Sequence, residues 1–282
     1  MPATDLLGGL FQFPFMRHAL VGGTAVAVLA GVIGYFVVLR GETFAAHTLS
    51  QAGFPGAAGA ALLSLPRLVG LIVLCVGSAL GIVALGPGRF SDRYGESAAI
   101  GSIQAFALAL GFLFASLYQG LLNGINAILF GNIVGISQNQ VIGLIVLAVL
   151  ILMAMGAMHR PLLFLTVDPE AAAAAGVPVR ALTAAFLVLL ALSVAAVTLI
   201  TGAVLVFALL VMPAAAAQQC TARPRTSVTL SVIFGLAIVW AAMTVAYFSN
   251  YPIGFFVTTF GFGLYLLTRA ARVLRAGRHA AA

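Results

Sequence analysis

The chain has 282 residues, of which 63% are hydrophobic and 7% are charged. A soluble domain carries about 25% charged residues, so this composition excludes an ordinary soluble fold and makes lipid the solvent for most of the chain. The formal net charge is +7 and all 13 basic residues are arginine; in so apolar a chain this excess is expected to face anionic lipid headgroups and not nucleic acid.

Nine apolar segments, separated by charges and turn residues, predict an all-α, polytopic transmembrane bundle that forms a single domain over residues 1–282. They cover residues 18–39, 52–65, 68–86, 101–118, 141–158, 181–199, 203–220, 228–247 and 253–268. A span needs about 20 residues, so the second segment is short and is expected to tilt or to enter the membrane only partway. Thr201 and Gly202 alone divide the sixth segment from the seventh, which leaves eight spans as the alternative.

The arginines predict how the chain is oriented. With the N-terminus outside, the cytoplasmic loops and the C-terminal tail hold all of them except Arg17 and Arg67. This separation follows the positive-inside rule, and it predicts a multi-pass protein of the bacterial cytoplasmic membrane. Residues 269–282 then form a basic cytoplasmic tail, which we expect to contact anionic membrane lipid.

Charged residues are absent from three long stretches, 97–159, 181–222 and 226–268. Carriers driven by protons or sodium commonly place ionisable groups inside the membrane, so an ATP-independent secondary carrier of a small solute is disfavoured, although it stays open with a membrane scaffold as a further alternative. An HExxH zinc motif is missing, and a P-loop needs a lysine, which this chain lacks. We therefore predict that the chain is not an enzyme, that it holds no tightly bound cofactor, and that any ATPase is a separate subunit.

Residues 160–180 form the longest predicted cytoplasmic loop, and they contain signals for a short helix over 169–175. Asp168 is a good N-cap and is followed by proline at the first helical position. Glu170 faces the positive end of the helix dipole, and a run of alanines follows. Gly176 supplies a left-handed stop. Such an alanine-lined helix is suited to close approach by a partner; the alternative is a capped connector without one.

This Asp-Pro-Glu loop resembles the coupling loop of the membrane subunits of zinc and manganese ATP-binding-cassette (ABC) importers. Further stretches resemble the same family in the same order between about residues 13 and 268. They are FMRHAL at 15–20, VLRG at 38–41, LSQAGFPG at 49–56, LFGNI at 129–133, TGAVLV at 201–206, LLVMPA at 209–214 and YPIG at 251–254. Each match is loose alone, but their common order makes the resemblance specific.

The resemblance implies a type II-like permease that pairs with a second copy and is driven by two cytoplasmic ATPase subunits through alternating access. An extracytoplasmic metal-binding protein would deliver a divalent metal. Residues 168–176 would sit in a groove of the ATPase, with Asp168, Glu170, Ala171 and Gly176 as the coupling residues. The cargo expected from this family is a divalent cation, with zinc preferred here and manganese or iron as alternatives.

The predicted metal site departs from the family pattern. Members often carry aspartate and histidine four residues apart near the second helix, whereas this sequence has His47 at the first position and Gln51 at the second. Residues at this spacing share one helical face, so we expect the pair to form a transit site. Imidazole suits zinc better than manganese, which favours zinc. The alternative is that His47 is a polar residue at a helix start with no role toward metal.

Pro213 lies inside the seventh predicted span. A proline in a helix lacks the backbone N–H that would bond the carbonyl four residues earlier, here that of Leu209. Pro213 is therefore a candidate hinge or gating residue. An ordinary tolerated kink is the alternative, because transmembrane helices accommodate proline well.

Overall fold

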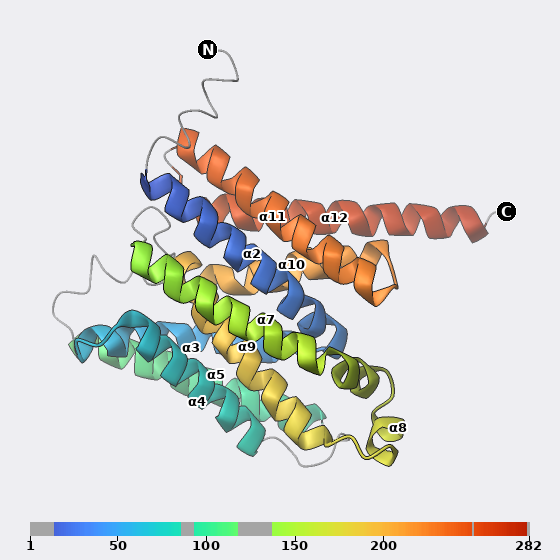
Figure 1. Cartoon of the computed structure of the whole chain (residues 1–282), viewed down its shortest axis with the longest axis horizontal. Coiled ribbons are helices and arrows are strands. Elements are labelled where there is room, and N and C mark those ends of the chain that lie inside the picture. The colour runs from blue at the N-terminus through green and yellow to red at the C-terminus, as the bar shows by residue number, and fades with distance from the viewer. Residues whose placement is uncertain (1–13, 86–92, 118–136, 250, 281–282) are drawn as a thin grey trace.

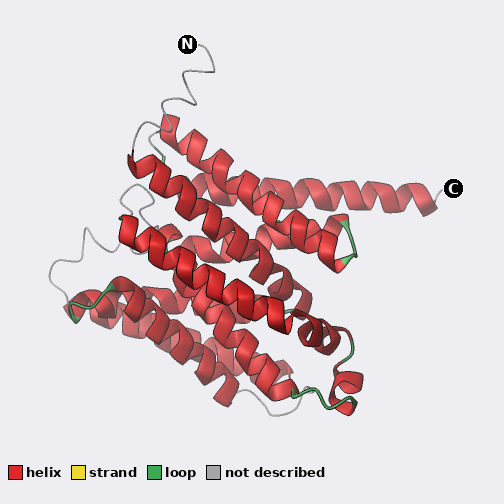
Figure 2. Ribbon diagram, in the orientation of Figure 1, coloured by secondary structure: helices red, strands yellow, loops and turns green. Residues whose placement is uncertain are grey.

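The computed structural model describes residues 14–85, 93–117, 137–249 and 251–280, and every regular element within these ranges is a helix (Figure 2). This confirms the predicted all-α class, and each of the nine apolar segments falls in a helix of its own. The helices are α2 (Pro14–Arg40), α3 (Thr43–Leu62), α4 (Arg67–Leu85), α5 (Arg93–Leu117), α7 (Gln138–Val167), α8 (Pro169–Ala174), α9 (Val179–Thr201), α10 (Ala203–Cys220), α11 (Pro224–Phe248) and α12 (Ile253–Ala280).

Seven helices in the described part of the chain are long and apolar enough to cross a membrane, and α3 and α10 are not among them. The apolar part of α10, Leu205–Cys220, is short, while α3 has sufficient length but too many polar residues. The helix that contains the second apolar segment is longer than the segment, because α3 begins nine residues earlier, at Thr43. Its first turns carry polar side chains, so the apolar run starts well after the helix does.

The helix α3 lies inside the bundle, where it packs against α4, α5, α9 and α10. Small residues allow these close contacts. A Cβ atom added to Gly56 would lie 2.7 Å from the backbone oxygen of Gly70 on α4, so only glycine fits at this crossing. Close backbone approach through small residues is how helices associate in lipid, where the hydrophobic effect between helices is missing.

Gly202 separates α9 from α10 as the sequence predicted. Its φ of 77° and ψ of 161° lie in a region that glycine alone adopts readily. Beyond this turn, α10 runs through Pro213 to Cys220 as one helix. Next to the proline, α2 comes so close that a Cβ at Gly34 would collide with the carbonyl of Leu210.

Two helices extend past their predicted ends. The helix α7 continues through Pro161 to Val167, so the first part of the expected loop 160–180 is helical. The last helix, α12, continues to Ala280 and projects away from the bundle (Figure 1). In both cases the helix continues past its first arginine, so a charged residue does not mark the end of the helix. Arg89 and the LFGNI stretch at 129–133 lie outside the described residues, as does the end of the tail, 281–282.

Candidate transport site and coupling face

His47 lies in the second turn of α3 and faces α10. Its ring meets that of Phe207 edge to face, with the centroids 4.9 Å apart and the planes at 74°. The side chain is half-buried, and its Nδ1 atom is buried without a hydrogen-bond partner in the part of the chain that the structure describes. A buried ring nitrogen in this state retains a lone pair or a proton to offer, which suits a ligand site better than a settled structural role.

Gln51 follows one turn later on α3 and is also half-buried. The structure therefore keeps His47 and Gln51 on one helix at the predicted spacing. The intervening turn is fixed by polar contacts: Thr48 donates to the side-chain oxygen of Gln104 on α5 at 3.1 Å, and the Ser50 hydroxyl donates to the His47 carbonyl at 2.7 Å. These bonds hold α3 in register at the candidate site.

Within the described residues, no group of three or more His, Cys, Asp and Glu side chains comes together. The polar atoms on α3 are instead one imidazole, one amide and several hydroxyls. Such ligands bind a divalent cation more weakly than carboxylates and imidazoles together do. A cation at His47 would therefore be held loosely.

The short helix α8 has the caps that the sequence predicted. The Asp168 carboxylate accepts the backbone N–H of Ala171 at 2.8 Å, and a proline occupies the first turn. At the other end, Gly176 has a φ of 80°, and the N–H of Val177 bonds the carbonyl of Ala172 at 3.0 Å. This is a Schellman stop. The helix spans Pro169–Ala174, one residue less than expected.

The surface of α8 is small and largely exposed. Asp168 and Glu170 point outward, whereas Ala172 is buried against the bundle. Figure 1 places α8 at one end of the molecule, between the end of α7 and the start of α9. The residues that the sequence predicted for coupling thus lie together on α8 and its two caps, on a different element from His47.

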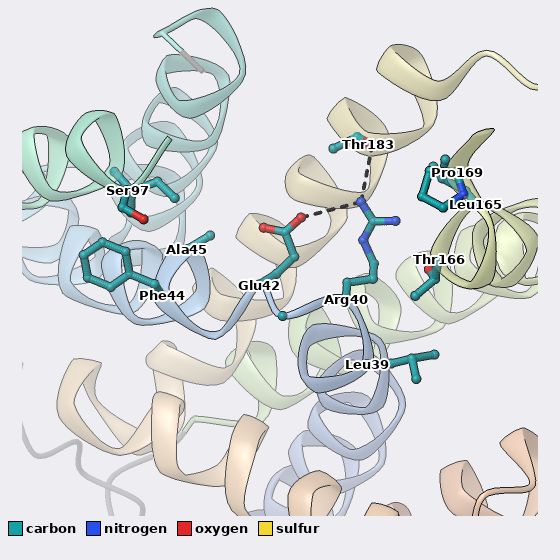
Figure 3. A pocket seen from close by; sticks show the side chains of 12 residues that line it. Leu39, Arg40, Glu42, Phe44, Ala45, Ser97, Leu165, Thr166, Pro169 and Thr183 are labelled. Carbon is teal, nitrogen blue, oxygen red and sulfur yellow. Dashed lines mark hydrogen bonds and ion pairs between the residues drawn. The ribbon is translucent and has the colours of Figure 1, made fainter. Parts of the chain in front are cut away.

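A cavity of about 450 Å³ lies beside α8 (Figure 3). Its walls come from the α2–α3 turn, α5, α7, α8 and α9, and they include an ion pair that the sequence analysis missed. Arg40 and Glu42 meet at 3.5 Å, with 8% and 13% of their side chains exposed. The two residues flank a glycine in the sequence, and no sequence pattern indicated that their side chains are mostly buried.

The sequence matches the ABC 3 transport family over residues 12–272. It is 33% identical over 245 residues to the manganese transport system membrane protein MntC of Halalkalibacterium halodurans. This match covers 85% of this chain and 80% of that protein. It is 27% identical to a probable iron transport system membrane protein of Haemophilus influenzae, with 93% and 92% covered.

Among solved structures, PsaBC from Streptococcus pneumoniae in complex with Fab is similar in fold. The TM-score is 0.84 at 26% identity, and the superposition covers 95% of both chains. The fold, the order of the helices and the sequence match extend over nearly the whole chain and agree with one another. The chain belongs to the ABC 3 transport family, whose members are membrane permeases of metal-importing ABC transporters.

Proposed function

We propose that this chain is the permease subunit through which a divalent metal ion, manganese in the first place, enters the cell. The observation that carries the proposal is the buried, unbonded Nδ1 atom of His47 on the polar face of α3, in a chain of this family. Gln51 offers an amide oxygen one turn away. Together they form the transit site, and the Phe207 ring covers one side of the imidazole.

Manganese is preferred over zinc because MntC of Halalkalibacterium halodurans and several other relatives are named as manganese transport proteins. The amide oxygen of Gln51 is compatible with this choice, since manganese favours oxygen ligands. The imidazole of His47 is a better ligand for zinc, so zinc is the second candidate and iron the third. Direct comparison of the three metals decides among them.

The driving force in this proposal comes from outside the chain. A pair of cytoplasmic ATPase subunits would receive α8 in a groove, with Asp168 and Glu170 at the contact and Ala171 and Gly176 shaping the helix. An extracytoplasmic metal-binding protein would deliver the ion, and a second copy of the permease would complete the passage. Pro213 is the proposed hinge in α10, the helix that faces His47.

The test uses a strain that lacks the chromosomal permease and carries a plasmid copy. With its own ATPase and binding protein present, the wild-type chain should restore uptake of radioactive manganese. His47→Ala should lower uptake about tenfold or more, which corresponds to about 1.4 kcal/mol of lost binding to the ion in transit. His159→Ala is the matched control, because that histidine is exposed and its Nδ1 atom lies 2.6 Å from the Gly156 carbonyl.

A double variant sharpens the test. His47→Asp with Gln51→His places carboxylate and imidazole at the family spacing and should keep or raise manganese uptake. Wild-type uptake in His47→Ala would remove the transit site. Normal manganese, zinc and iron uptake in the deletion strain would favour a scaffold, and concentration of an ion by the purified chain alone in liposomes would favour a secondary carrier.

A further inference from the structure

Arg40, the last residue of α2, is a buried arginine that contacts Glu42 and two residues of α9. Its Nη2 atom lies 3.5 Å from the Glu42 carboxylate and donates to the Thr183 hydroxyl at 3.3 Å, and its guanidinium lies over the Phe186 ring, 5.0 Å from the centroid. Figure 3 shows the first two of these interactions as dashed lines. Burying a charged guanidinium costs desolvation free energy. This cost is offset only where the partners of the charge are held in a good geometry.

Glu42 joins this cluster to the start of α3. Between the two charges Gly41 has a φ of 74°, which makes the reversal possible, and the N–H of Glu42 bonds the carbonyl of Val37 at 2.9 Å. The Glu42 carbonyl then accepts the N–H of Ala46 in the first turn of α3. His47 is five residues past Glu42, about 7.5 Å further along the helix axis.

Thr183 and Phe186 join the same cluster to α8. Both lie in the first two turns of α9, which begins at Val179. Four residues, 175–178, separate α9 from α8, and they are fixed by the Schellman bonds and by the bond from the Leu182 N–H to the Pro178 carbonyl. A displacement of α8 must therefore move the start of α9 and the partners of Arg40 with it.

The cavity supplies the space for such a displacement. Leu165, Thr166 and Pro169 form the wall on the side of α8, while Ser97 and Ile100 of α5 face the cavity from another side. Close-packed interiors transmit movement but do not yield without free volume. Arg40 and Glu42 line this free volume, so they join α2, α3 and α9 where these helices have room to move relative to α5.

We propose that Arg40 is a positioning residue that couples α8 to α3. In this proposal the pair Arg40–Glu42, which we name the clamp, carries movement of the coupling helix through α9 to the helix that bears His47. The clamp touches neither the metal nor ATP. It rests on the proposed function, because it needs an ATPase partner at α8.

The experiment measures ATP hydrolysis and manganese uptake together, in proteoliposomes that contain the full transporter with its ATPase and binding protein. Arg40→Gln should lower the number of ions moved per ATP hydrolysed by about fivefold or more, the lower range for an energetic coupling between sites. Basal ATP hydrolysis and copurification of the ATPase should stay as in the wild type. Arg160→Gln, an exposed arginine at the end of the apolar part of α7, is the control.

Two further variants guard against a chain that fails to fold. Thr183→Val removes one hydrogen bond at nearly constant volume, and it should lower the same ratio to a smaller extent. Adding Glu42→Gln to Arg40→Gln should cause no loss beyond that of the single variant, because residues of one network are not additive. A wild-type ratio in both Arg40→Gln and Thr183→Val would overturn the clamp, whereas absence of ATP-dependent uptake in the wild type would overturn the proposed function itself.

A different groove, of about 430 Å³, lies between α7 and α11, with α2 as its floor. Figure 1 shows α2 between these two helices. The walls are mostly apolar and include Val32, Phe36, Leu152 and Val228, while the end toward the α11 start carries His159 and Arg225. Gly156 lines the groove, and a Cβ at this position would meet no atom within 4 Å among the described residues, so there is room for a larger side chain to enter the groove.

We infer that this groove binds an anionic phospholipid of the inner leaflet. One acyl chain would lie along the apolar walls, and the phosphate would face Arg225 and His159. The charge is complementary: basic pockets between transmembrane helices on the cytoplasmic side suit anionic headgroups. This inference is independent of the clamp and of the transported metal.

The test compares nanodiscs of phosphatidylglycerol with nanodiscs of phosphatidylcholine. Native mass spectrometry of the wild-type chain should show phosphatidylglycerol retained in preference, and Arg225→Gln should lower that preference about fivefold. Gly156→Leu should abolish it by filling the groove. The matched controls are Arg223→Gln, next to the groove but outside its lining, and Gly143→Leu, an equally open glycine on α7.

Unchanged retention in both groove variants would overturn the inference. Loss of a permease dimer in Gly156→Leu, with no change in bound lipid, would show instead that a second copy covers the groove, and it would count against lipid. Equal retention of both lipids by the wild type would also count against an anionic ligand.

Discussion

The helices α3 and α7 contrast in how many of their residues are buried and in their hydropathy. Fourteen of the twenty residues of α3 are buried, against seven of the thirty in α7. Yet α7 has the highest mean hydropathy of the seven candidate spans, whereas α3 is not a candidate span. Side chains that face lipid must be apolar, whereas side chains that face other helices need only fit closely, and they include the polar ones.

The comparison explains where function is found in this chain. Both candidate metal ligands lie on α3, and His47 faces α10; neither of these two helices meets the requirements for a span. Polar residues inside a membrane protein face the interior of the bundle and mark the pathway. Low hydropathy in a long buried helix is therefore a better guide to the candidate site here than the strongest apolar segments.

The largest expected effect is on packing. Phe54 of α3 is 1% exposed, whereas Leu150 of α7 is 54% exposed. Phe54→Ala should destabilise the chain by about 3 kcal/mol, because its cavity has no lipid to fill it. Leu150→Ala should cost far less, since lipid tails replace the lost contacts. Reversible unfolding in mixed micelles measures both, and equal losses would contradict the contrast between the two helices.

The second effect reverses in sign between the two helices. Gly56→Ala should destabilise by about 1–3 kcal/mol, because the new methyl group meets the α4 backbone. Gly143→Ala on α7 meets no described neighbour and should stabilise by about 0.5–1 kcal/mol through better helix propensity. The same unfolding experiment applies, and a gain in stability for Gly56→Ala would show that α3 and α4 are less tightly packed than described.

Sequence reasoning recovered the parts of this fold that depend on local signals. The helices, the Gly202 turn and both caps of α8 follow from residues that lie next to one another in the chain. The ends of α7 and α12 were misplaced because an arginine ends an apolar run in the sequence without terminating the helix. The start of α3 was misplaced because its first turns are polar.

The site was predictable only in part, for the same reason. The pairing of His47 with Gln51 is a matter of helical spacing and could be read from the sequence. The contact of His47 with Phe207 and the bond from Arg40 to Thr183 join residues more than 140 positions apart. No local pattern encodes such contacts, which depend on how the helices pack.

A smaller effect is expected at the end of α7, where it meets α8. Asp168→Ala removes the acceptor for the Ala171 N–H and should destabilise α8 by about 1 kcal/mol. Asp168→Asn keeps an acceptor but removes the charge. If capping alone matters, Asn should preserve copurification with the ATPase while Ala weakens it. Equal weakening by both would assign the role to the charge, and no change in either would remove Asp168 from the coupling face.

The smallest effect on stability is expected at two prolines, one in α10 and one in α7. Pro213 lies inside α10 and Pro161 inside α7. Replacing either by alanine restores a backbone N–H, so the free energy of unfolding should change by less than about 1 kcal/mol, since membrane helices accommodate proline. Transport should separate the two variants. Pro213→Ala should slow manganese uptake, because α10 faces His47 and loses its hinge, whereas Pro161→Ala should leave uptake unchanged. Equal uptake by the two variants would mean that Pro213 is an ordinary tolerated kink and that α10 does not bend during transport.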